Sequence, residues 1–251
     1  MNQRLIFNGP KPITFEGSMR PQMPERLAKA WKAAQGSVPR PPKNAAVAAN
    51  VLLIYDMIGY DWWTGGGITP ADVNDWLAAV PNGTAEIEVR INSPGGNVFD
   101  GIAIYNALIN CGMKVNVRID ALAASVASII AMAGDQISIA GNGEIFVHKA
   151  WSIAMGNADD FTKEAAALNS IDGSLVATYV ARTGQSEDDI RQMMKDETWL
   201  NAATAKEKGF VETIDPLKTA PEQPAADSVA VRHNILRQRT QLLQRQAIAA
   251  A

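Results

Sequence analysis

The strongest constraint on the fold is a repeated alternation of strand-like and helix-like segments in the middle of the chain. Residues 85–92 alternate apolar and charged side chains, as a half-buried strand does, and residues 99–110 carry apolar side chains at helical spacing. A second strand-like segment, 114–121, precedes an apolar helical segment that begins at Ser125. Strands that are connected through a helix lie parallel in one sheet. The sequence therefore predicts an α/β fold of repeated strand–helix units.

The same patterns predict the remaining elements. The apolar run 51–58 has strand length, and Thr69 followed by Pro70 is typical of the start of a helix, which should run to about Val80. Further along the chain we expect two short strands, three helices and a last strand. These lie at 137–140 and 144–148 (strands), at 159–182, from Ser186 to Lys195 and from Asn201 to Gly209 (helices), and at 210–214 (strand).

Composition divides the chain into three parts. Residues 1–47 are proline-rich and are expected to form an N-terminal arm or pro-segment, residues 48–214 the folded domain, and residues 215–251 a C-terminal tail. Net charge follows a similar division: +6 for residues 1–50, −11 for 51–214 and +2 for the remainder. An acidic body with basic arms is not typical of a nucleic-acid-binding domain, so we expect no nucleic-acid partner and favour self-association.

Cysteine and histidine are too scarce for several classes of site. The single cysteine, Cys111, excludes an internal disulfide and a multi-cysteine metal site, and it fits a reducing cytoplasm. No apolar run reaches the roughly 18 residues needed to span a bilayer, so we expect no membrane partner. Only two histidines are present, His148 and His233, and the second lies in the predicted tail. We therefore expect neither a metal nor a cofactor.

One serine has two interpretations. Ser125 follows a strand-like segment and a run of small residues, and it precedes an apolar helix. It could be an ordinary helix N-cap, which is much the commoner role for such a serine. It could also be a nucleophile exposed at a strand-to-helix turn, and such a nucleophile needs only one general base, which His148 could supply. Ser128, one turn further on, is interpreted as a serine inside the helix.

Several motifs in order decide between these interpretations, because together they resemble the proteolytic subunit of the Clp protease, ClpP. The resemblance covers about two thirds of the chain, and its specificity comes from the order and spacing of the motifs. They are Asn92-Ser93-Pro94-Gly95-Gly96, Ala123-Ala124-Ser125, Val147-His148, Arg182-Thr183-Gly184-Gln185-Ser186, Trp199-Leu200-Asn201-Ala202 and Lys208-Gly209-Phe210-Val211.

The resemblance implies a ClpP/crotonase-like fold with a protruding handle helix, and it assigns roles to particular residues. Ser125 matches the nucleophile and His148 the general base, while the backbone N–H groups of Gly96 and Val126 match the oxyanion hole. The segments expected to hold an extended substrate are Asn97-Val98 and Lys149-Ala150-Trp151.

The third member of the triad is the main departure from the family pattern. The family's acid is usually aspartate, whereas the aligned residue is Glu197, with Asp196 directly before it. A glutamate can still orient a histidine and stabilise its cation. Asp196 remains the alternative acid, since a slip of one residue at the end of a helix would exchange the two. A third reading makes both residues solvated surface charges.

The motif variants most resemble ClpP-related proteases of phages and prophages. This resemblance implies a serine endopeptidase that cleaves capsid or scaffold precursors in the host cytoplasm or the procapsid, and that forms a ring-shaped homo-oligomer through the helix at 159–182. Three alternatives stay open: a general ClpP-like peptidase working with an ATP-dependent unfoldase, an inactive structural ring, and a crotonase-type acyl-CoA enzyme.

Overall fold

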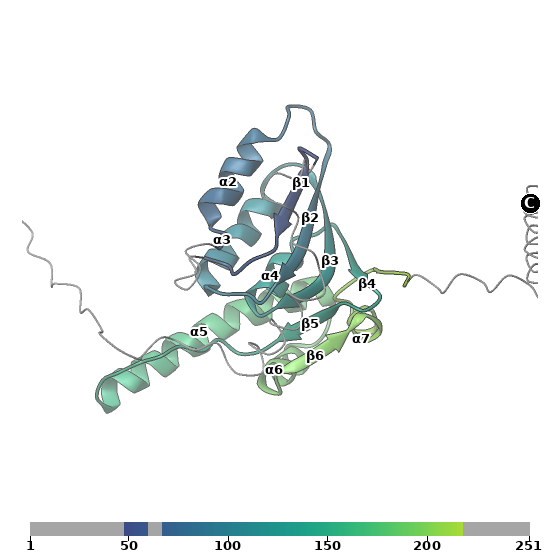
Figure 1. The fold of residues 1–251 in the computed structure, drawn as a ribbon. Helices are drawn as coiled ribbons and strands as arrows, with labels where there is room; N and C mark the ends of the chain where they lie inside the picture. Colours follow the sequence, from purple (N-terminus) through teal and green to yellow (C-terminus); the bar gives the residue numbers. More distant parts are fainter. Residues whose placement is uncertain (1–47, 60–66, 218–251) are drawn as a thin grey trace, which may run out of the picture. The chain divides into compact units, whose positions relative to one another are not determined.

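The structure, a computed structural model, describes residues 48–59 and 67–217. From β1 to β4 its elements alternate between strand and helix, as the sequence predicts (Figure 1). In chain order they are β1 (Val51–Ile54), α2 (Pro70–Ala79), β2 (Glu86–Ser93), α3 (Val98–Ile109), β3 (Lys114–Ala124), α4 (Val126–Ala131), β4 (Gln136–Ala140), β5 (Glu144–Val147), α5 (Ala158–Thr183), α6 (Glu187–Lys195), β6 (Thr198–Asn201), α7 (Ala202–Glu207) and β7 (Thr213–Asp215).

The strands form one sheet in the order β1-β2-β3-β4-β7, with parallel pairing along this path. The long strand β3 changes neighbour along its length. Residues 116–119 pair with β4, whereas residues 122–124 pair with β5, which in turn pairs antiparallel with β6. The predicted parallel α/β sheet is therefore confirmed, and the branch at the end of β3 brings β5 and β6 to the place where Ser125 follows the strand.

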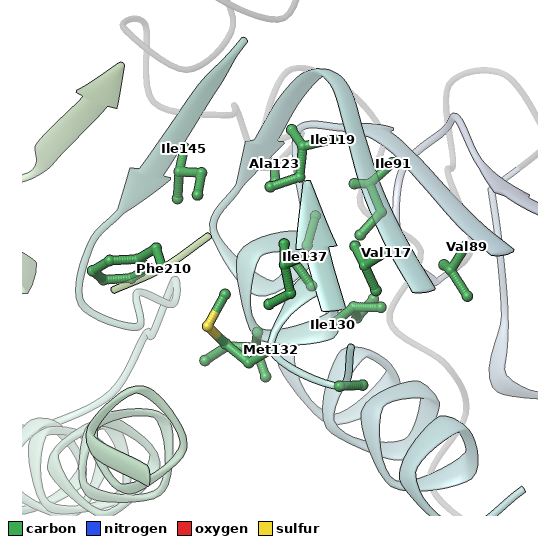
Figure 2. Packing of buried hydrophobic residues seen from close by; sticks show 14 of the residues in the cluster. Val89, Ile91, Val117, Ile119, Ala123, Ile130, Met132, Ile137, Ile145 and Phe210 are labelled. Atoms are coloured by element: carbon green, nitrogen blue, oxygen red, sulfur yellow. The ribbon is translucent and has the colours of Figure 1, made fainter. Parts of the chain in front are cut away.

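Register explains the core. The alternation in β2, β3 and β4 places apolar side chains at paired positions, such as Val89 opposite Val117 and Val117 opposite Ile137. All three side chains are almost fully buried. Figure 2 shows them together with Ile130 from α4 and with Met132, the residue that caps the C-terminus of this helix. Burial of an aliphatic side chain of this size contributes about 1.5–3 kcal/mol.

The alternate side chains of the sheet are charged and pair with one another. Both carboxylate oxygens of Asp120 take part, since Arg90 donates two hydrogen bonds of 2.8 Å to this group. Arg118 lies 3.1 Å from the same carboxylate and 3.2 Å from Asp215 on β7. This network ties β2, β3 and β7 together on the polar face of the sheet.

Several predicted strand boundaries differ from the structure, and one strand was missed. The first strand ends at Ile54, before the predicted Ile58, because the Asp56 side chain accepts the N–H of Met57 and interrupts the extended backbone. The last strand begins at Thr213, because Phe210 is instead buried in the core directly after the turn at Gly209. Strand β6 was not predicted at all, since its four residues carry too little pattern to be detected.

The other helices agree with their predictions to within a few residues. The helix α2 begins at Pro70 with a complete capping box on Thr69, and α5 spans Ala158–Thr183. The predicted arm, 1–47, and all but the first residues of the predicted tail lie outside the described residues. Among the described helices, none is long and apolar enough to cross a membrane.

Candidate active site

The turn between β3 and α4 holds Ser125 in a conformation that few non-glycine residues adopt. Its φ is 56° and its ψ −133°, and its side chain makes no capping hydrogen bond to α4. Strained backbone of this kind costs about 1–3 kcal/mol and is found mainly at functional sites. The N-cap interpretation of Ser125 was therefore wrong with respect to the side chain, which points to another partner.

That partner is His148, directly after β5. The Nε2 atom of His148 lies 2.8 Å from the Oγ atom of Ser125, within hydrogen-bonding distance. The two residues meet because β5 pairs with the end of β3, and the backbone N–H of Ser125 itself donates to the carbonyl of Phe146 at 2.8 Å. The His148 ring also stacks on Phe146, with ring centroids 5.2 Å apart, so its orientation is constrained on one face.

Strand register brings Glu197 near the histidine. In the antiparallel pair of β5 and β6, Val147 is the partner of Thr198, so His148 and Glu197 each lie one residue beyond this last pair, at the same end of the two strands. The charge of Glu197 raises the pKa of His148, although burial of the ring is the larger effect and holds that pKa below its ordinary value of 6.5. Glu197 also has a positive φ, 51°, at the turn from α6 into β6.

Asp196 occupies a different position. It caps the C-terminus of α6, and both of its carboxylate oxygens accept hydrogen bonds of 2.8 Å from the Gln192 side chain, one turn earlier on that helix. This contact directs the Asp196 carboxylate back along α6. The geometry therefore favours Glu197 over Asp196 as the carboxylate that faces the imidazole.

Two glycines that follow β2 are closely packed, Gly95 against the serine turn and Gly96 against the backbone of Ile58. A Cβ atom on Gly95 would lie 2.6 Å from the Ser125 Cβ, and one on Gly96 would lie 2.1 Å from the carbonyl oxygen of Ile58. Both glycines have positive φ. Only glycine fits here, because neither the space nor the backbone conformation admits a side chain.

These elements surround a cleft of about 340 Å³. Its lining brings together every predicted site residue of the nucleophile, base, oxyanion and substrate-binding groups. These are Ser125, His148, Gly96, Val126, Asn97, Val98, Lys149, Ala150 and Trp151. The predicted acid, Glu197, does not line the cleft, although its charge acts on His148.

Part of the cleft was not foreseen, because α5 forms one of its walls. Leu168, Ile171 and Leu175 line the cleft, whereas the resemblance implied only a role in ring assembly for this helix. Asp172 from the same helix is buried, accepts the N–H of Ala150 at 2.8 Å and lies 3.7 Å from the Lys149 Nζ. The only signal in the sequence was an acidic residue on an otherwise apolar helix face.

Chemically, the arrangement suits nucleophilic catalysis. A hydroxyl hydrogen-bonded to a neutral imidazole, with a carboxylate on the far side of the ring, is the constellation of a serine hydrolase. In the part of the chain that the structure describes, no three His, Cys, Asp or Glu side chains are grouped closely enough to hold a metal ion.

Comparison with known proteins agrees with this geometry. The family described as Clp protease matches residues 75–216, which is more than half of the chain. Among solved structures, a mutant of ClpP1 from Listeria monocytogenes is 22% identical, with a TM-score of 0.58 over 68% of this chain and 93% of that chain. At this identity the second match shows the fold, which is that of ClpP. The chain therefore belongs to the Clp protease family and is a serine peptidase.

Proposed function

We propose that the protein is a serine endopeptidase in which Ser125 is the nucleophile, His148 the general base and Glu197 the orienting acid. The contact of 2.8 Å between Ser125 Oγ and His148 Nε2 carries this proposal. Burial supports it as well, because a lowered pKa keeps His148 neutral, and only a neutral imidazole can accept the serine proton.

The reaction then follows from the arrangement of the cleft. As Ser125 Oγ attacks the carbonyl carbon of the scissile peptide, His148 Nε2 takes the hydroxyl proton, and negative charge develops on the former carbonyl oxygen. The N–H groups of Gly96 and Val126 stabilise this oxyanion. The tetrahedral intermediate collapses to an acyl-enzyme as His148 returns the proton to the leaving amine, and a water molecule activated by His148 then hydrolyses the ester.

Substrate would bind as an extended strand between two segments of the cleft. Asn97-Val98 lies at the start of α3, and Lys149-Ala150-Trp151 follows the histidine. Recognition of this kind uses main-chain hydrogen bonds more than side chains, which suits a peptidase of broad specificity.

The biological role we propose is maturation of a phage head, with capsid or scaffold precursors as substrates in the bacterial cytoplasm or the procapsid. The support is the resemblance of the motifs Ala123–Ser128 and Glu197–Leu200 to phage and prophage members of the family. A ring-shaped homo-oligomer assembled through α5 is part of this proposal. The alternative role, degradation together with an ATP-dependent unfoldase, rests on the family alone.

A fluorophosphonate probe tests the chemistry, and co-expression tests the role. The full-length protein should be labelled at Ser125, and Ser125→Ala should abolish both labelling and peptide hydrolysis. Absence of labelling in the assembled wild-type protein would contradict the assignment. Co-expression with a phage major capsid protein, taken from a gene beside this one where such a gene is present, should give a shortened capsid chain with the wild type and an intact one with Ser125→Ala. An intact capsid chain in both cases would argue against the maturation role while leaving the peptidase assignment standing.

A further inference from the structure

Two buried hydroxyl groups lie directly behind the proposed nucleophile. Ser128 on α4 is 0% exposed and Tyr179 on α5 is 2% exposed, and their oxygen atoms are 2.7 Å apart. Burying a hydroxyl costs free energy unless it is hydrogen-bonded, and an apolar pair would fill the same space without that cost. The pair therefore calls for an explanation beyond packing.

The direction of the hydrogen bonds follows from counting protons. The Ser128 Oγ donates to the backbone carbonyl of Ser125 at 2.6 Å. A serine hydroxyl has a single proton, so Ser128 has none left for Tyr179 and must accept from it. The chain of donation runs from the Tyr179 hydroxyl to the Ser128 hydroxyl and from there to the carbonyl oxygen of Ser125.

This chain of hydrogen bonds acts on the peptide that follows the strained residue Ser125. The carbonyl of Ser125 accepts a second hydrogen bond, from the backbone N–H of Ser128 at 3.0 Å. A residue at φ 56° keeps its conformation only when its surroundings over-determine it. The hydroxyl and the N–H of Ser128 hold the carbonyl of Ser125 in place, and the hydrogen bond from the Ser125 N–H to the Phe146 carbonyl holds its amide.

The same peptide unit carries one of the proposed oxyanion donors. The carbonyl of Ser125 and the N–H of Val126 belong to one planar peptide and point in opposite directions. Fixing the carbonyl toward Ser128 therefore fixes the Val126 N–H toward the opposite side, where Val126 lines the cleft. A displacement of this carbonyl by a few tenths of an ångström therefore displaces the Val126 N–H by a similar distance.

We infer that Ser128 and Tyr179 are positioning residues that hold the Ser125–Val126 peptide in its active orientation. This inference rests on the proposed function, because it needs Ser125 as nucleophile and Val126 as donor. Tyr179 acts only through Ser128, while its ring packs on Phe210 with centroids 5.6 Å apart and lines the cleft. The tyrosine thereby makes the geometry of the serine turn depend on the seating of α5.

The test compares Ser128→Ala, Tyr179→Phe and the double variant in a peptide assay with the full-length protein. We expect kcat to fall about 10-fold to 100-fold in Ser128→Ala and about 3-fold to 10-fold in Tyr179→Phe, with KM nearly unchanged, since a displaced oxyanion donor weakens the transition state alone. Because Tyr179 acts through Ser128, the double variant should lose no more than Ser128→Ala by itself.

A peptide boronate, which forms a tetrahedral adduct with the serine, gives a second readout. Its affinity should fall in parallel with kcat, whereas a purely structural loss would lower the amount of folded protein and leave both values per active site unchanged. Matched controls are Tyr105→Phe, a half-buried tyrosine on α3, and Ser174→Ala, an exposed serine whose hydroxyl bonds to a carbonyl of its own helix. Both controls should keep wild-type kcat.

Three results would overturn the inference: kcat within twofold of wild type in both single variants, a change confined to KM, or losses that multiply in the double variant. Should Ser128→Ala fail to fold, Tyr179→Phe, which keeps the ring, decides by the same kcat and boronate criteria. Ser125→Ala separates the two levels of the argument. If it is inactive while Ser128→Ala and Tyr179→Phe remain fully active, only the positioning role fails, and if it retains activity, the proposed nucleophile fails.

Discussion

Replacing Gly96 by alanine tests the oxyanion site most directly, because the structure gives the size of the perturbation. A Cβ atom at this position would lie 2.1 Å from the carbonyl oxygen of Ile58, whereas real Cβ contacts essentially never fall below 3.0 Å. The two segments must therefore separate by about 0.9 Å, the difference between these distances. The obstacle is backbone, which also pairs with Gly96 in an isolated bridge, so no side-chain rotation can relieve it.

Stability and activity should both respond. The φ of Gly96 is 152°, and strain in this region together with overpacking should cost about 2–6 kcal/mol of unfolding free energy. A shift of about 0.9 Å also moves the amide of residue 96 away from the oxyanion, so kcat should fall about 10²-fold to 10³-fold. Peptide hydrolysis and a denaturation curve at one fixed protein concentration measure the two effects.

Gly83→Ala is the matched control. Gly83 also has a positive φ, 86°, but a Cβ atom there would meet nothing within 4 Å, so only the conformational cost of about 1 kcal/mol remains. This variant should keep wild-type kcat with a small loss of stability. The reasoning fails if Gly96→Ala retains kcat within tenfold of wild type while it folds, or if both variants lose activity equally.

The remaining predictions concern the ionisable groups. Because burial lowers the pKa of His148, the acid limb of kcat/KM should have its midpoint below 6.5, and a flat profile between pH 5 and 8 would exclude His148 as the base. Since the charges of Glu197 and Asp172 raise the pKa of His148, Glu197→Gln should move the acid limb of kcat/KM to still lower pH. A shift to higher pH would contradict the interaction of Glu197 with His148. Glu197→Ala should lower kcat about 10²-fold to 10⁴-fold and Asp196→Ala less than threefold, and the reverse pattern would make Asp196 the acid. Asp120→Asn should lower the unfolding free energy by about 1–2 kcal/mol, because it removes the buried negative charge to which Arg90 and Arg118 bind, while kcat per folded molecule stays unchanged; an unchanged denaturation midpoint would show that the network contributes nothing.

The sign of the histidine's effect on stability follows from the same shift. A histidine with a lowered pKa in the folded state binds fewer protons there than in the unfolded chain. Its contribution to stability is therefore present above the unfolded pKa of about 6.5 and is lost as the pH falls below it. Acid inactivation of the peptidase should thus combine protonation of the base with a loss of stability in the same direction.

The sequence by itself determined the parallel α/β architecture, and it was sufficient to propose Ser125 and His148 as the nucleophile and its base. Period-two alternation in β2 and β3 requires one buried face, and helical connections between them require parallel strands, so local patterns sufficed. The proposal for Ser125 and His148 came from the order and spacing of the motifs around them, which together resemble one family. The contact between them at 2.8 Å follows once β5 pairs with the end of β3.

Tertiary structure alone decided the rest, because the deciding contacts join residues far apart in the chain. The choice between Glu197 and Asp196 depends on the antiparallel register of β5 and β6, and β6 is too short to leave a pattern in the sequence. The link from Tyr179 through Ser128 spans 51 residues and depends on how α5 packs beside α4. A buried hydroxyl looks like any other core position in the sequence, and only its partners in space distinguish a residue that fills the core from one that orients the nucleophile.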